Sequence, residues 1–144
     1  MNSNILAFTT LENTLAESGK SFRDYLAPEF GKVYVVTITR DNCSACERHK
    51  PKLRRLVKKV SAEQGDKVVF IQVYVKQLSG NQEESMRSKD MFGHYFYPTD
   101  LLLLRTADRG VVEMYRNVSP TMKELEANIS ATLQVAEFIA KETG

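Results

Sequence analysis

The sequence predicts an α/β domain whose central mixed sheet, of four or five strands, is flanked by helices on both faces. Two runs of mostly β-branched and aromatic residues, 33–39 and 68–75, show little polar alternation, which is typical of strands covered on both sides. A segment with helical periodicity separates these runs. Two further strand-like runs, 101–104 and 111–115, lie close enough together to form a hairpin. A strand–helix–strand unit followed by a hairpin favours a mixed sheet with helices on both faces.

Length and composition are those of one ordinary globular domain. The chain has 144 residues, of which 42% are hydrophobic and 26% are charged. We therefore expect a single domain over 1–144, with a variable segment over 1–31 and the core over 32–144. A net charge of +2 is too small for binding nucleic acid or a membrane by charge alone, and no apolar run approaches the roughly 18 residues of a transmembrane helix. Residues 1–8 lack the pattern of a secretory signal, so the expected location is cytoplasmic.

The first 31 residues combine several short elements. Residues 5–8 could form a short strand, and Leu11 and Leu15 lie one helical turn apart. Ser21 could cap a second helical turn that ends before Pro28.

The strongest helical pattern covers residues 44–62. Its apolar residues recur at intervals of three and four and form one stripe: Leu53, Leu56, Val57 and Val60. A polar turn over 40–42 precedes this helix, in which Asp41 or Asn42 could serve as the N-cap. Gly65 ends it.

The second half of the chain continues the alternation. A polar loop over 76–83 precedes a weaker helix over 84–92, and a turn over 107–110 joins the two strands of the hairpin. Ser119 and Pro120 open the last helix, with the proline at its first position. The buried face of that helix is marked by Met122, Leu125, Ile129, Leu133, Ala136 and Ile139.

Chemistry is concentrated in two cysteines. Having only two excludes a multi-disulfide framework and a four-cysteine metal site. Cys43 and Cys46 are separated by two residues, a spacing that two randomly placed cysteines would show in roughly one case in 70. They lie at the end of a buried strand and the start of a helix, where unpaired N–H groups favour a thiolate. By this geometry Cys43 is the more exposed nucleophile, and Cys46, one turn later, is the resolving thiol.

Three motifs together resemble the thioredoxin family. They are the Cys43–Cys46 pair, Pro51 five residues after the second cysteine, and Pro98-Thr99 before a run of aliphatic residues. The resemblance covers roughly residues 30–142 in the order of the elements. It implies a divergent member with the thioredoxin fold that acts as a thiol–disulfide oxidoreductase and needs no bound cofactor.

The resemblance also implies a substrate site. Pro98 would be cis, and the backbone of Tyr97 would pair with an extended segment of a disulfide-containing protein substrate. Asn42, Ser44, Ala45 and Pro51 would shape the site. Electrons would come from a partner of the thioredoxin-reductase type or from a small thiol, with no nucleic-acid or membrane partner.

Two positions depart from the family pattern. Asn42 stands where a tryptophan is usual, and Thr37 stands where thioredoxins place a buried aspartate that helps to deprotonate the resolving thiol. The missing acid supports an alternative function, a thioredoxin-like binding module with a slow or silent disulfide that docks a partner protein.

The cysteines also have structural interpretations. They could form a purely structural disulfide, or, with His49 and a fourth ligand from His94 or a carboxylate, a zinc site. The position at a helix start followed by Pro51 argues against zinc. We expect His49 to be a partly exposed helix residue, and His94 to be packed or on the surface.

The helix after the cysteines is strongly basic. One face is lined by Arg48, Lys52, Arg55 and Lys59. Such a face is usually only solvated, and the alternative is that it docks an acidic partner. In the aromatic run 95–97, we expect Phe96 in the core and Tyr97 near the site.

Overall fold

The computed structural model describes residues 3–77, 80–107 and 110–143. It contains a single five-stranded sheet within these ranges. The strands are β1 (Ser3–Ala7), β2 (Val33–Arg40), β3 (Val68–Val75), β4 (Thr99–Ala107) and β5 (Gly110–Val118). Their order across the sheet is β1-β3-β2-β4-β5. Strands β1 and β2 run parallel to β3, whereas β4 is antiparallel to both β2 and β5. The predicted mixed sheet is confirmed.

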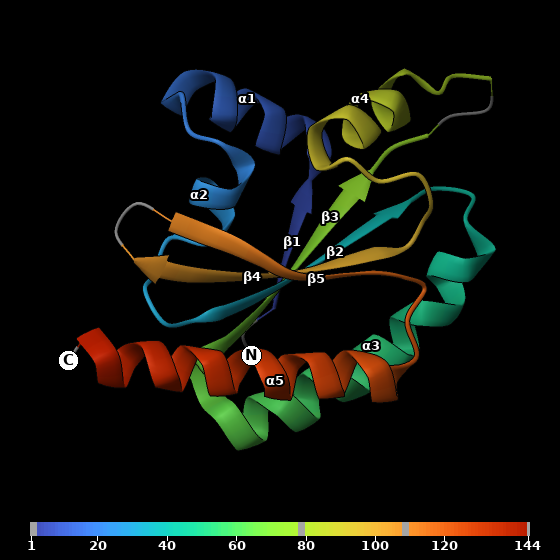
Figure 1. The fold of residues 1–144 in the computed structure, drawn as a ribbon. Coiled ribbons are helices and arrows are strands. Elements are labelled where there is room, and N and C mark those ends of the chain that lie inside the picture. Colours follow the sequence, from blue (N-terminus) through green and yellow to red (C-terminus); the bar gives the residue numbers. More distant parts are fainter. Residues whose placement is uncertain (1–2, 78–79, 108–109, 144) are drawn as a thin grey trace.

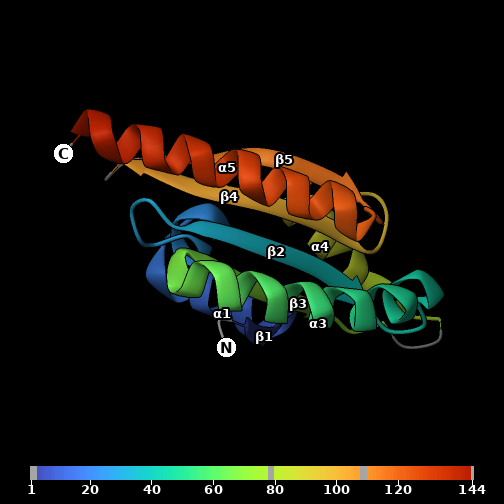
Figure 2. The same ribbon diagram turned by 90° about the horizontal axis from the view of Figure 1, so that it is seen from below.

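Helices cover both faces of this sheet, as predicted. They are α1 (Phe8–Ser18), α2 (Phe22–Leu26), α3 (Ser44–Gln64), α4 (Glu83–Phe92) and α5 (Met122–Thr143), with a short 3₁₀ turn at Gly65–Lys67. Figure 1 shows α1, α2 and α4 on one face and α3 and α5 on the other. Figure 2 shows α3 and α5 running along the same face of the sheet. Among the described residues, none of the helices combines the length and the apolar composition that a membrane span requires.

The central position of strand β2 in the sheet explains why its sequence lacks polar alternation. Tyr34, Val36 and Ile38 pack into the core beneath α1, α2 and α4, whereas Val33 and Val35 pack into the core beneath α3 and α5. Because successive side chains of a strand point to opposite faces, a strand at the centre of a three-layer fold must be apolar on both.

The beginning of the chain is part of the sheet. Strand β1 pairs in parallel with β3 at one edge. Phe8 and Leu11 of α1 are fully buried in the core on that side. Ser21 caps α2 as predicted, accepting a hydrogen bond from the Asp24 N–H at 3.2 Å.

Helix α5 starts later in the chain than predicted. Helix α5 begins at Met122, so the prediction of Pro120 as its first residue is wrong. The Thr121 hydroxyl accepts the Glu124 N–H at 3.1 Å and thereby acts as the cap, while Pro120 is buried ahead of the helix. Part of the predicted turn over 107–110, residues 108–109, lies outside the described residues.

Phe92 connects three helices on one face of the sheet. The centre of its ring lies 4.9 Å from the ring centre of Phe22 and 6.2 Å from that of Phe8, and Phe92 is 2% exposed. We expect Phe92→Ala to lower the free energy of unfolding by about 3–5 kcal/mol, because it leaves a cavity among three helices. The exposed Phe138 provides a control, since Phe138→Ala should change it by less than about 0.5 kcal/mol. Urea unfolding measures both, and equal losses would contradict the packing described here.

Candidate active site

The two cysteines lie at the start of α3. Cys43 is the N-cap residue of the helix and is disulfide-bonded to Cys46, with their Cα atoms 5.2 Å apart. The Cys43 Sγ accepts a hydrogen bond from the Cys46 N–H at 3.1 Å. Cys43 is 8% exposed and Cys46 only 1%. The outer sulfur is therefore the one held by an N–H group of the helix N-terminus, an arrangement that stabilises a thiolate after reduction.

The N-cap of α3 differs from the sequence prediction, because neither Asp41 nor Asn42 caps it. The Asp41 carboxylate instead accepts the Gln77 N–H at 3.1 Å. Asn42 adopts a positive φ of 53° and donates from its side chain to the Gln77 carbonyl at 3.3 Å. Both side chains are thus engaged with the chain that follows β3, which leaves the cap position to the cysteine.

The loop before β4 faces the outer cysteine. The Tyr97–Pro98 peptide bond is cis, and the Tyr97 carbonyl oxygen lies 3.8 Å from the Cys43 Sγ. Pro98 is buried, whereas Tyr97 is half-buried and its hydroxyl lies 2.9 Å from the Ser85 hydroxyl. Backbone of the Tyr97–Pro98 segment is therefore presented directly beside the disulfide.

Arg40 joins the two halves of the site and was not foreseen from the sequence. Its Nη1 donates to the carbonyls of Asp41 and Asn42, at 2.8 and 3.0 Å. Its guanidinium also lies 5.3 Å from the centre of the Tyr97 ring. The only sequence signal was a charged residue closing an otherwise uncharged strand.

The remaining predicted shaping residues lie along α3. Ser44 is exposed, Ala45 is half-buried, and Pro51 lies inside the helix on its exposed side. The structure thus brings Ser44 and Ala45 to the disulfide through the chain itself, whereas Pro51 is more than a turn beyond Cys46.

The expectation that Phe96 belongs to the core is wrong. Its side chain is 65% exposed, and that of Tyr95 is 79% exposed. The backbone anchors this loop instead, because the Phe96 carbonyl accepts the Thr99 hydroxyl at 2.7 Å and faces the His94 Nδ1 at 3.2 Å.

A buried acid–base pair lies on the inner side of α3. Asp100 is completely buried, and its Oδ2 is 3.1 Å from the Nε2 of His49. The other carboxylate oxygen accepts a hydrogen bond from the Thr37 hydroxyl. Neither Oδ2 nor Nε2 has a well-aligned hydrogen bond to any described residue. Buried polar groups are normally hydrogen-bonded, so this incompletely bonded pair is unusual among the described residues.

The expectation of a partly exposed His49 is therefore wrong, since the side chain is buried. It continues the apolar stripe of α3, because it lies four residues before Leu53, which in turn lies three residues before Leu56. His49 therefore faces the sheet. Cys46 precedes it by three residues and lies on the same side. The sequence signal for Asp100 was a single carboxylate next to the aliphatic run of β4. An aspartate buried there needs a partner, and this requirement points to a residue such as His49.

Strand register places this pair on the face of the sheet that α3 and α5 cover. Asp100 is opposite Thr37 in the antiparallel pairing of β4 with β2. Both share the face of Val35 and Leu102, which pack beneath α3 and α5. A buried carboxylate thus lies next to the position where the family pattern expects one, contributed by the neighbouring strand.

His94 supports the loop that carries Tyr97. It is buried, with its Nε2 2.9 Å from the Ser88 hydroxyl and its ring 4.7 Å from the Tyr97 ring. Burial lowers the pKa of His94 to about 4, helped by the nearby charges of Lys89 and Arg116. Within the described residues, no three His, Cys, Asp or Glu side chains converge to hold a metal ion.

No protein-family model and no curated protein matches this chain. Solved structures do. A Fasciola hepatica thioredoxin is 18% identical with a TM-score of 0.54, over 90% of this chain and 98% of that chain. Thioredoxin f2 of Chlamydomonas reinhardtii is 22% identical with a TM-score of 0.56, over 88% and 93%. A thioredoxin f2 in complex with ferredoxin:thioredoxin reductase is 18% identical with a TM-score of 0.55, over 90% and 94%.

These likenesses, together with the sheet order and helix layers, show that the chain has the thioredoxin fold. Within that fold it carries its paired cysteines at the start of α3 and a cis-proline beside them.

The buried His94 predicts an acid-sensitive fold. Because its pKa is lowered to about 4 from 6.5, the unfolded chain takes up the proton first as the pH falls. Its contribution is complete above about pH 6.5 and is lost between about 6.5 and 4, on the order of 2–3 kcal/mol. Urea unfolding across this range measures the loss. In His94→Asn this part of the pH dependence should vanish, and an unchanged profile in the variant would refute the assignment.

Proposed function

We propose that this protein is a thiol–disulfide oxidoreductase that reduces or exchanges disulfides in protein substrates. The observation that carries the proposal is the Cys43–Cys46 disulfide at the N-terminus of α3, with Cys43 outermost and beside the Tyr97 carbonyl. A disulfide closed across one helical turn needs little rearrangement to open and reform.

The first step uses the reduced protein. The Cys43 thiolate attacks one sulfur of the substrate disulfide, which forms a mixed disulfide and releases the other substrate sulfur as a thiolate that takes up a proton. An extended substrate segment pairs with the backbone of Tyr97 beside Pro98, as an added strand would. This pairing holds the substrate disulfide next to Cys43.

The second step releases the product. Cys46 loses its proton and attacks the Cys43 Sγ, so that the Cys43–Cys46 disulfide forms and the second substrate thiolate leaves. Two electrons and two protons pass from the protein dithiol to the substrate. A reductase or a small thiol then returns two electrons to the protein.

The His49–Asp100 pair is the proposed acceptor of the Cys46 proton. It is buried on the same side of α3 as Cys46, and its two facing atoms are 3.1 Å apart. The alternative of a silent binding module was supported by the lack of an acid at Thr37. Because Asp100 places a carboxylate against the Thr37 hydroxyl, an acid is available beside that position, which supports the enzyme over the binding module.

The electron donor is proposed from the same comparison. One structural neighbour is a thioredoxin f2 in complex with ferredoxin:thioredoxin reductase, which supports a reductase-type partner. A small thiol is the second candidate donor. We propose a reducing, cytoplasmic setting, in which the resting form of the pair is mainly the dithiol.

The roles of the two cysteines can be separated by substitution. With dithiothreitol as donor and insulin as substrate, the parent should reduce the disulfide, whereas Cys43→Ser should show only the background rate. Cys46→Ser should accumulate a mixed disulfide through Cys43, visible by mass spectrometry and lost on reduction. A parent no faster than Cys43→Ser would eliminate the enzyme and leave the binding module.

Removing the buried acid should slow the second step. Asp100→Asn preserves shape but not basicity, so the mixed disulfide should persist on the order of 10²-fold longer, with an altered pH dependence of its decay. His49→Gln should act in the same direction. Thr39→Val, a buried change on the same face of β2, is the control. Decay at the parent rate and pH profile in Asp100→Asn would rule out this proton acceptor.

A further inference from the structure

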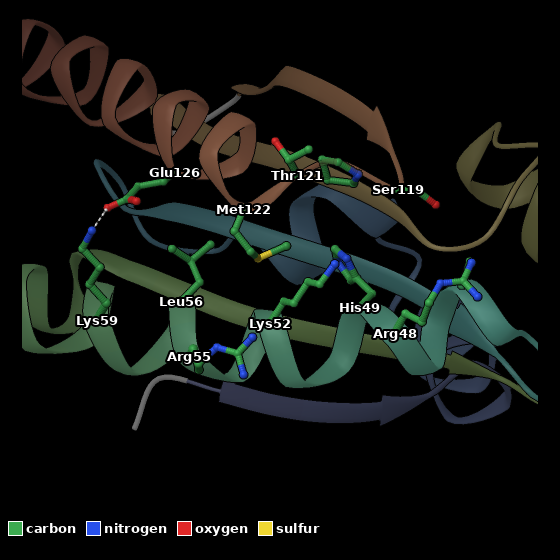
Figure 3. Close-up of a pocket in the computed structure, with 12 residues that line it drawn as sticks. Arg48, His49, Lys52, Arg55, Leu56, Lys59, Ser119, Thr121, Met122 and Glu126 are labelled. Atoms are coloured by element: carbon green, nitrogen blue, oxygen red, sulfur yellow. Dashed lines mark ion pairs between the residues drawn. The ribbon is translucent and has the colours of Figure 1, made fainter.

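A pocket of about 580 Å³ opens between α3 and the start of α5. Figure 3 shows its lining side chains, with Leu56 of α3 and Met122 of α5 pointing toward one another and Lys52 extending from α3 toward α5. Leu56 is buried and Met122 half-buried, so the pocket has a partly apolar floor.

Its α3 wall is strongly basic. Arg48, Lys52, Arg55 and Lys59 all line it. Lys59 is neutralised by Glu126 of α5, with their charged atoms 2.7 Å apart. Within the described residues, no carboxylate lies within ion-pair distance of Arg48, Lys52 or Arg55. Three cations therefore line the pocket without an ion-pair partner among the described residues.

The pocket adjoins the proposed active site at two points. Ala45, which lies between the two cysteines in sequence, forms part of its lining. On the opposite side, the N–H of the lining residue Ser119 donates to the Pro98 carbonyl at 2.9 Å. A substrate segment held beside Tyr97 and Pro98 thus has the pocket within a few residues of its disulfide.

The start of α5 adds to the positive potential. The Glu124 N–H is satisfied by the Thr121 hydroxyl, and the Leu125 N–H by the Thr121 carbonyl. The first N–H groups of the helix have no acceptor within the helix, and they carry the positive end of the helix dipole. Thr121 and Met122 place this end at the rim of the pocket.

We propose that this pocket binds carboxylate side chains of an acidic segment next to the disulfide of the protein substrate. The inference rests on the proposed function and specifies its substrate class. Carboxylates fit because each can accept charge-assisted hydrogen bonds from Arg48, Lys52 or Arg55. The Lys59–Glu126 pair closes the far end, so the occupant is a short acidic stretch.

A nucleic acid fits this pocket poorly. Single-stranded nucleic acids bind where aromatic side chains stack on bases along a basic groove. Among the described residues, no Phe, Tyr or Trp lines the pocket.

The test compares two disulfide-bridged peptides that differ only by two Glu or two Gln residues beside the cysteine. The parent should reduce the Glu peptide about tenfold more efficiently, by kcat/KM, at low salt. Lys52→Glu should abolish or invert this preference. Lys58→Glu makes the same charge change at an exposed residue of α3 that lines a separate groove, and should retain the preference.

A binding measurement keeps this inference separate from the proposed function. Fluorescence anisotropy with cysteine-free versions of the two peptides should show tighter binding of the Glu peptide to the parent, and loss of that difference in Lys52→Glu. If neither bridged peptide is reduced but this difference persists, the enzyme fails and the pocket stands. The carboxylate site would be overturned if both peptides were reduced with the same kcat/KM and bound with the same affinity. Equal effects of Lys52→Glu and Lys58→Glu, or tighter binding of a single-stranded oligonucleotide than of the Glu peptide, would also overturn it.

Discussion

The whole site depends on the position of strand β2 between β3 and β4. Strand β2 pairs in parallel with β3 and antiparallel with β4. Because β4 is antiparallel to β2, the last residues of β2 lie opposite the first residues of β4, with Ile38 facing Thr99. The turn that leaves β2 leads into Cys43, and the loop that enters β4 carries Tyr97 and Pro98. Two segments more than 50 residues apart therefore meet at one edge of the sheet, at the 3.8 Å between the Cys43 Sγ and the Tyr97 carbonyl oxygen.

The same pairing brings chemistry to the inner side of the helix. One step further into the sheet, Thr37 lies opposite Asp100, so the carboxylate lies under α3, against His49. His49 then belongs to two environments, since it contacts Asp100 on one side and lines the basic pocket on the other. The buried acid and the pocket for an acidic segment are thus adjacent but separated by one imidazole ring, which keeps the substrate carboxylates apart from Asp100.

The sequence predicted the strands and helices well because their signals are strong and local. Residues 68–75 match β3, and the stripe of α3 was readable from the spacing of its apolar residues. The cysteine spacing and Pro98 led to the site because short motifs can be recognised in the sequence without knowing which residues are in contact. Where prediction failed, contacts across the fold decided the outcome. The Phe96 side chain can be exposed because the backbone carbonyl of Phe96 anchors the loop before β4. His49 is buried because Asp100, 51 positions away, offers it a partner.

The contacts around the disulfide are made largely by main-chain atoms. Arg40 holds the carbonyls of Asp41 and Asn42, and the carbonyls of Tyr97 and Pro98 face Cys43 and Ser119. A carbonyl is present whatever side chain a position carries, so the neighbouring residues can be replaced over evolutionary time without moving these atoms. A site held in this way depends more on the course of the backbone than on the identity of the side chains beside it.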